Sequence, residues 1–122
     1  MLKRILLLFI VIISFIGCGK DFQYYMKVIN DVNYEYKFSK MEVDWDEYSV
    51  SFYLVDKTHD DLSMDEMQSQ AIIINDYIIN KYPRIDSLKF RHYIFSGVGD
   101  FEIAKFTLNQ NKKVIKAKRL LD

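Results

Sequence analysis

The polar segment DKTHDD, residues 56–61, gathers residue types that carry acid–base and metal chemistry in proteins. It contains three carboxylates and one imidazole, which belong to Asp56, His59, Asp60 and Asp61. Such groups bind divalent metals or form a general base with its orienting acid. However, their spacing matches no known ligand motif, and a loop that leads into a helix is commonly rich in aspartate. We therefore expect a solvated loop, with a metal-dependent or hydrolytic envelope enzyme as the alternative and His59, Asp60 and Asp61 as its weak metal candidates.

The second histidine, His92, lies 33 positions from His59 in the sequence. It falls in LKFRHYIF, where alternation places it on the same strand face as Phe90 and Ile94. A metal site would require another histidine or a cysteine close by. We expect His92 to be a hydrogen-bonded residue at the margin of a sheet.

The glycines in GVG, Gly97 and Gly99, are separated like the first two of a dinucleotide-binding loop. That fingerprint needs a third glycine where Glu102 stands, and a helix after it. A strand pattern follows instead, so these glycines are interpreted as turn residues. We expect no cofactor.

The only cysteine, Cys18, ends an apolar stretch that begins after two basic residues, Lys3 and Arg4. The 13 residues from Ile5 to Gly17 would span about 20 Å as a helix, which is short of the roughly 30 Å of a bilayer core. A positive segment, a short apolar core and small residues are typical of a removable secretory signal.

The four residues FIGC, which end at Cys18, resemble the lipobox of bacterial lipoproteins. The resemblance covers residues 1–18. It implies that a diacylglyceryl group is attached to the sulfur of Cys18, that a signal peptidase cuts between Gly17 and Cys18, and that an acyl chain such as palmitate is often added to the new amino group. Stable membrane attachment needs at least two acyl chains, which a diacylated cysteine supplies. The implied products are a signal peptide of residues 1–17 and a lipidated mature chain of residues 18–122.

Two other interpretations of the N-terminus stay open. An ordinary signal peptidase would use Gly17 and Gly19 as its small residues and cut before Lys20, discarding Cys18. Alternatively, the apolar segment is an uncleaved anchor or a buried element. Within the lipoprotein resemblance, Gly19 after the cysteine implies the outer membrane in preference to the inner membrane. The pair of Lys20 and Asp21 is weakly similar to a surface-export signal, so both the periplasmic and the surface face are open.

The mature chain would have 105 residues, enough for one domain and too few for two. Half of the sequence is hydrophobic, so a core is available without disulfides. Without Lys3 and Arg4 the formal charge falls from zero to about −2, which argues against a nucleic-acid partner. We expect a non-catalytic module, anchored through Cys18, that binds an envelope protein as an assembly subunit, an inhibitor or an immunity factor.

The strongest helix pattern spans residues 63–82. Ser63 and Glu66 form an S-x-x-E capping box, and Pro83 disfavours helical geometry at Tyr82. Apolar residues recur on one side at intervals of three and four, namely Met67, Ala71, Ile74 and Ile78. A shorter helix with Asp21 as its N-cap is expected earlier in the chain, from the spacing of Phe22, Tyr25, Met26 and Ile29.

Alternation of polar and apolar residues predicts strands on both sides of the long helix. They are expected at residues 34–46, with a bulge or turn near Ser39 and Lys40, and at residues 48–55, 88–95, 101–108 and 114–120. Short connections imply antiparallel pairing. The predicted architecture is an α+β domain with two layers and the order α?-β-β-α-β-β-β. In it an antiparallel sheet of four to five strands has one face in water and the other covered by one long helix.

Overall fold

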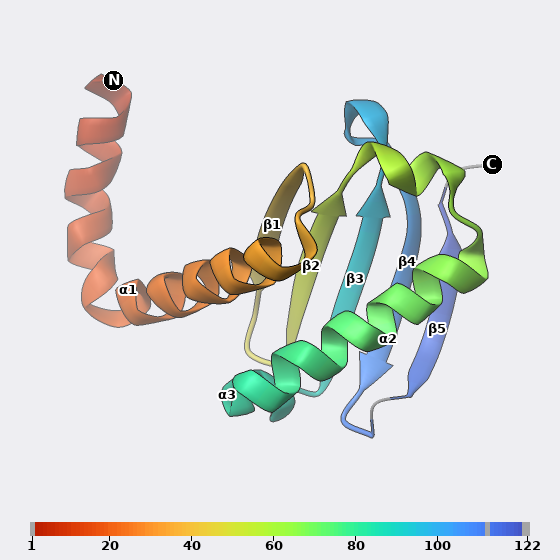
Figure 1. The fold of residues 1–122 in the computed structure, drawn as a ribbon. Helices are drawn as coiled ribbons and strands as arrows, with labels where there is room; N and C mark the ends of the chain where they lie inside the picture. The colour runs from red at the N-terminus through yellow and green to blue at the C-terminus, as the bar shows by residue number, and fades with distance from the viewer. Residues whose placement is uncertain (1, 112, 121–122) are drawn as a thin grey trace.

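The computed structural model describes residues 2–111 and 113–120, with side chains from residue 19 onward. It contains one five-stranded sheet with helices packed on one face (Figure 1). The elements in chain order are α1 (Leu2–Tyr36), β1 (Lys40–Trp45), β2 (Ser49–Val55), the 3-10 helix η1 (Lys57–Asp61), α2 (Met64–Lys81), α3 (Pro83–Asp86), β3 (Phe90–Ser96), the 3-10 helix η2 (Val98–Asp100), β4 (Glu102–Asn109) and β5 (Val114–Arg119). The predicted α+β class and the order of helices and strands are confirmed.

The strands lie in the sheet in their chain order, from β1 to β5. Three neighbouring pairs are antiparallel, but β2 and β3 run parallel, with Ser49 opposite Phe90 and Val55 opposite Ser96. The prediction of an entirely antiparallel sheet is therefore wrong. Parallel neighbours need a crossover of a dozen or more residues, and α2 and α3 supply it between β2 and β3. The hairpin signals used for the prediction fix only the other three pairs.

Helix α2 begins and ends where the sequence predicts. The hydroxyl of Ser63 accepts a hydrogen bond from the backbone N–H of Glu66, and the carboxylate of Glu66 accepts one from the N–H of Ser63, each at 3.1 Å. The backbone N–H of Tyr82 closes the last turn, and Pro83 starts the short helix α3. The four predicted core residues, Met67, Ala71, Ile74 and Ile78, are all buried.

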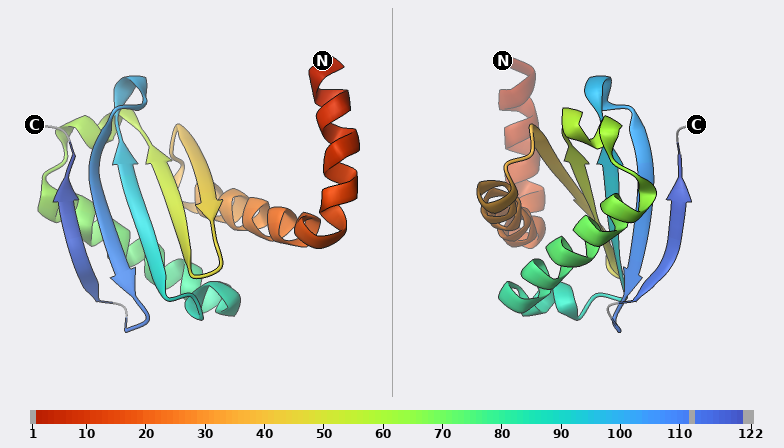
Figure 2. Two further views of the ribbon diagram at one scale, coloured as in Figure 1. Left: turned by 180° about the vertical axis from the view of Figure 1, so that it is seen from behind. Right: turned by 45° about the vertical axis from the view of Figure 1, so that its right-hand side comes forward.

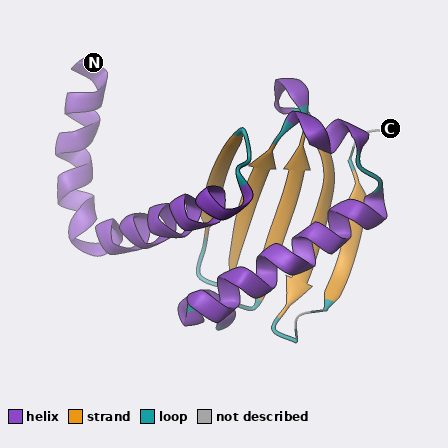
Figure 3. Cartoon of the chain, in the orientation of Figure 1, coloured by secondary structure: helices purple, strands orange, loops and turns teal. Residues whose placement is uncertain are grey.

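Helix α1 is the second covering element. Its second half lies on the same sheet face as α2, as Figures 1 and 2 show. The buried residues of this half recur at intervals of three and four, namely Tyr25, Val28, Ile29 and Val32. Asp21 is not an N-cap, because α1 continues through it and its carboxylate instead pairs with Arg84 of α3. The expectation of one covering helix is thus corrected to two, α2 and the second half of α1, which are among the purple helices of Figure 3.

The strand predicted from residue 34 onward begins later than expected. Tyr34 and Tyr36 complete α1, and Lys37 ends the helix in a left-handed conformation with φ of 56°. Tyr36 lies four residues after the buried Val32, so helical geometry turns its ring toward Tyr77 of α2, with the ring centroids 5.7 Å apart. Tyr34 points the other way and is 83% exposed. Packing against α2 therefore favours helix where the alternation alone suggested strand.

Candidate functional site

The loop that follows β2 is organised by the carboxylate of Asp56. It caps η1 by accepting a hydrogen bond from the N–H of Thr58 at 3.2 Å, and it also accepts one from the Thr58 hydroxyl. Its other oxygen accepts from the N–H of Ser39 at 3.2 Å and from the Ser39 hydroxyl at 2.8 Å. The Thr58 and Ser39 hydrogen bonds favour the ionised form and lower the pKa of Asp56 to about 2, against a smaller opposing effect of burial. Asp56 thus joins the start of β1 to the end of β2.

His59 is held inside the domain by the same short helix. Its side chain is 1% exposed, and Nδ1 lies 3.0 Å from the carbonyl oxygen of Ser96 at the end of β3. The ring meets Phe95 edge to face at a centroid distance of 5.0 Å and lies 5.6 Å from Phe38. The solvated position expected for His59 is therefore wrong, because its imidazole fills a space between aromatic rings.

The other two acidic residues of the predicted loop point elsewhere. The carboxylate of Asp60 accepts a hydrogen bond from the N–H of Val98 at 3.3 Å. It lies so close to Gly97 that a Cβ there would be 2.0 Å from a carboxylate oxygen, which explains the first glycine of GVG. The second, Gly99, has φ of 78°, as a turn glycine does. Asp61 is exposed.

The four candidate residues thus do not form a metal centre. In the part of the chain whose side chains are described, no group of three or more His, Cys, Asp or Glu residues could hold a metal ion. Asp56 and His59 do come together, but as two walls of one cavity. That cavity has a volume of about 260 Å³ and is lined by Tyr36, Lys37, Phe38, Asp56, Thr58, His59, Gln70, Ile73 and Ile74.

Sequence reasoning found only part of this cavity. Residue type indicates Asp56 and His59, whereas alternation places Tyr36 and Phe38 in a strand that in the structure begins only at Lys40. One signal in the sequence could have placed Tyr36 in a helix. It follows Val32 by four residues and so continues the apolar side of α1. The cavity forms where α1 ends, because the chain must turn there from the helical layer into β1.

His92 is hydrogen-bonded, as predicted, but it lies on β3, the central strand, and not at the margin of the sheet. Its Nδ1 lies 2.8 Å from the hydroxyl of Thr107 on β4. Burial lowers the pKa of His92, and the charge of Lys105 adds to this effect. His92 lies on the sheet face that the helices leave open, which the left view in Figure 2 presents.

A second buried polar centre, absent from the sequence prediction, surrounds Arg91. The sequence placed Phe90, His92 and Ile94 on one strand face, and the structure turns the opposite face, with Arg91, Tyr93 and Phe95, toward the helices. The guanidinium of Arg91 is fully buried, and burial lowers its pKa.

The guanidinium of Arg91 is surrounded by acceptors. Nε donates to Oδ1 of Asn75 at 2.7 Å, and Nη2 donates to the carbonyl oxygen of Asn109 at 2.5 Å. Nη1 reaches three further carbonyl oxygens at 3.3 to 3.4 Å, those of Ile85, Asp86 and Leu88. Tyr93 donates its hydroxyl to the same Oδ1 of Asn75 at 2.8 Å. This centre joins α2, α3, β3 and β4 at the end of the sheet where α2 terminates.

The predicted lipidation site, Cys18, and the predicted cleavage site after Gly17 lie outside the residues whose side chains are described. Over the part of the chain that is described, none of the helices is apolar over a length that would cross a bilayer. Comparisons with protein-family models, with curated proteins and with solved structures each yielded no match for this chain.

Proposed function

We propose that this protein is a small lipoprotein of the bacterial cell envelope, anchored through Cys18, whose single domain binds an envelope protein without catalysis. The observation that carries the proposal is the sequence FIGC after a short apolar segment with a basic start. In this proposal residues 1–17 are removed as a signal peptide. The anchored chain, residues 18–122, is held at a membrane, with the outer membrane preferred.

The position of the domain core relative to Cys18 is consistent with such an anchor. The first core residue in the described part of the chain is Tyr25, which lies seven residues after Cys18 in the same helix. Seven helical residues span about 10 Å. A lipid on Cys18 would therefore hold the domain against the bilayer surface without a flexible spacer, and any partner would be an envelope component within reach of that surface.

Hydrogen bonds within the loop make two of its carboxylates, those of Asp56 and Asp60, less available as general bases. The oxygens of Asp56 are engaged by Ser39 and Thr58, and one oxygen of Asp60 by Val98. A general base needs a carboxylate or imidazole within reach of a substrate proton. Replacement of His59 by alanine tests the alternative directly, since loss of hydrolysis or metal uptake with the fold intact would favour an enzyme.

The anchor is tested by intact-mass analysis of the full chain, expressed in a bacterium and extracted from its membranes with detergent. We expect a species that begins at Cys18 and carries the added mass of a diacylglyceryl group. The Cys18→Ser variant is the matched control and should accumulate with residues 1–17 attached. A wild-type species that begins at Lys20 without lipid, or that retains residues 1–17, would overturn the proposal.

The binding role is tested separately by extracting the anchored protein from its native envelope under mild conditions and identifying associated proteins by mass. We expect a stoichiometric envelope partner that resists washing with salt. Recovery of the chain without any such partner would contradict the binding role and leave the anchor result unaffected.

A further inference from the structure

His59 carries a polar atom that the fold leaves without a partner. A carbonyl oxygen can only accept a hydrogen bond, so the contact between Nδ1 and Ser96 assigns the proton to Nδ1. The remaining nitrogen, Nε2, forms no hydrogen bond with the described residues, although the side chain is 99% buried. Nε2 is not among the fully buried side-chain atoms without a partner in the described part of the chain, so it keeps access to the cavity that His59 lines. Nε2 is therefore an acceptor that the ring can offer to the cavity it lines.

The cavity beside His59 has walls suited to a single planar ring. Tyr36 and Phe38 lie nearly parallel, with their centroids 6.3 Å apart and an angle of 26° between the planes. Ile73 and Ile74 of α2 contribute an aliphatic wall. Aromatic rings favour stacked or edge-to-face contacts with another ring. The volume of about 260 Å³ is below the roughly 300 Å³ at which drug-sized pockets begin, so one ring is the fitting size.

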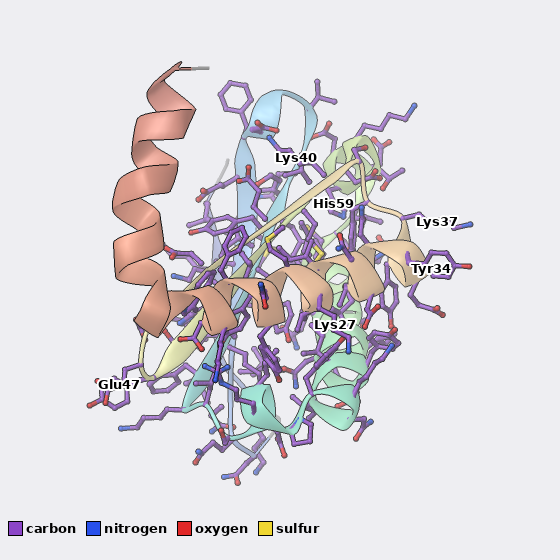
Figure 4. All side chains as sticks on the ribbon, turned by 90° about the vertical axis from the view of Figure 1, so that its left-hand side faces the viewer. Lys27, Tyr34, Lys37, Lys40, Glu47 and His59 are labelled. Atoms are coloured by element: carbon purple, nitrogen blue, oxygen red, sulfur yellow. The ribbon has the colours of Figure 1, made fainter. Side chains whose placement is uncertain are left out.

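Charge at the cavity narrows the choice of ligand. Asp56 lines the cavity, and its low pKa keeps it ionised at neutral pH, so a carboxylate or phosphate would be repelled. Lys37 also lines the cavity, but its side chain is directed away from the domain, as Figure 4 shows. A purely aliphatic or benzene-like group would fit the walls but would leave Nε2 unpaired. A neutral ring with a hydroxyl group avoids the repulsion by Asp56 and donates a hydrogen bond to Nε2 of His59.

We propose that this cavity binds a phenol ring, whose hydroxyl donates a hydrogen bond to Nε2 of His59 while its faces pack against Tyr36, Phe38 and the isoleucines of α2. The phenol belongs either to a tyrosine side chain of a partner or to a free small phenol. The proposal deepens the binding role given above by naming the group that is recognised. It does not depend on lipidation of Cys18.

The test compares probe pairs that differ by one hydroxyl, p-cresol with toluene and N-acetyltyrosinamide with N-acetylphenylalaninamide. The full chain is used in detergent micelles, whether or not residues 1–17 have been removed, and affinities refer to the free probe concentration measured by dialysis. We expect p-cresol to bind at least about tenfold more tightly than toluene, the difference that one hydrogen bond provides. Equal binding of the two, or no saturable binding of p-cresol, would overturn the proposal.

The two pairs also distinguish the sources of the phenol. Saturable binding of N-acetyltyrosinamide, with a preference over the phenylalanine analogue, supports a tyrosine side chain as the ligand. Binding of p-cresol without binding of N-acetyltyrosinamide supports a free phenol, because the mouth then excludes an attached backbone. In both cases NMR of the histidine ring nitrogens locates the probe. Binding of p-cresol should shift the Nε2 resonance of His59 and leave that of His92 unchanged.

Two variants locate the binding. His59→Phe retains a ring of similar size and removes the acceptor, so the preference for p-cresol over toluene should disappear. Because this change also leaves the Ser96 carbonyl without its donor, a second variant keeps His59. Ile73, 56% exposed on α2, is replaced by tryptophan to fill the mouth, and Asn80→Trp, two turns further along the same helix, is the matched control. Loss of p-cresol binding in Ile73→Trp alone supports the proposal, and unchanged binding in both variants would overturn it.

Discussion

Arg91 and His59 are both buried polar side chains that reach backbone carbonyls, but their surroundings differ. The guanidinium of Arg91 is enclosed by acceptors from α2, α3, β4 and the loop before β3, although Nδ2 of the neighbouring Asn75 is buried without a partner. His59 has one bonded nitrogen and one that offers a lone pair to a cavity. Buried polarity that is satisfied within the chain stabilises a particular arrangement of elements. Buried polarity that is unsatisfied beside a cavity is available to a ligand. The comparison thus separates a structural centre from a candidate binding centre within one domain.

Replacing Arg91 is the most direct test of the structural role assigned to its centre. Arg91→Ala should lower the free energy of unfolding by about 3–5 kcal/mol, because it removes a large buried side chain and the donors that it directs to Asn75 and to the carbonyl oxygen of Asn109. Urea denaturation measures the loss. Lys89→Ala, an exposed basic residue nearby, is the control and should change stability by less than about 0.5 kcal/mol. A loss below about 1 kcal/mol for Arg91→Ala would remove the structural role assigned to this centre.

The cavity side of the comparison depends on Asp56. Because folding lowers the pKa of Asp56 from 3.8 to about 2, its ionised form stabilises the folded state fully above about pH 4, and this contribution is lost as the pH falls toward 2. Asp56→Asn should therefore lower the unfolding free energy by about 1–2 kcal/mol at pH 7. The difference between wild type and variant should shrink toward pH 2 in urea titrations. If the difference in unfolding free energy between wild type and variant does not change with pH, the charge of Asp56 does not stabilise the loop.

A smaller change tests the hydrogen bond between Tyr93 and Asn75 in the Arg91 centre. Tyr93→Phe removes only the hydroxyl that donates to Asn75, so a loss of about 1 kcal/mol is expected. Tyr53→Phe, on the open sheet face, is the matched control and should have little effect. Thermal unfolding of the two variants measures the difference. If both behave like the wild type, Tyr93 contributes through packing rather than through its hydrogen bond.

The smallest effect is expected at the mouth of the cavity and has the opposite sign. Lys37 adopts a left-handed conformation that glycine tolerates without strain, so Lys37→Gly should stabilise the domain by about 0.5–1 kcal/mol. Lys27→Gly, at an exposed position inside α1, should destabilise it by about 1 kcal/mol. Chemical denaturation distinguishes the two signs. Destabilisation by both substitutions would indicate that the Lys37 side chain itself holds the cavity mouth in place.

Local signals in the sequence account for much of the fold. The capping box at Ser63 and Glu66, the proline at 83 and the apolar spacing of α2 fixed that helix, because each acts on its own neighbours in the chain. The order of strands and helices followed from the same kind of pattern. What the local patterns could not supply was the partner of each strand, so the parallel pairing of β2 with β3 was missed.

The candidate site was less accessible to sequence reasoning, for a physical reason. His59 lies in a polar segment and would be solvated by composition alone, but the Ser96 carbonyl and the rings of Phe38 and Phe95 bring it inside. Arg91 shows the same effect, since contacts with α2, α3 and β4 bury a charged residue of β3. Both depend on contacts between segments that are far apart in the chain.

The parallel seam between β2 and β3 has a consequence for how the chain assembles. The hairpin of β1 with β2 and the three-stranded meander from β3 to β5 each close over short loops, whereas the seam joins segments on either side of the whole α2–α3 crossover. Closure entropy makes such long-range pairing the slow event in folding. The two halves of the sheet would thus form early, and the domain would become cooperative only when the α2–α3 crossover brings β3 beside β2.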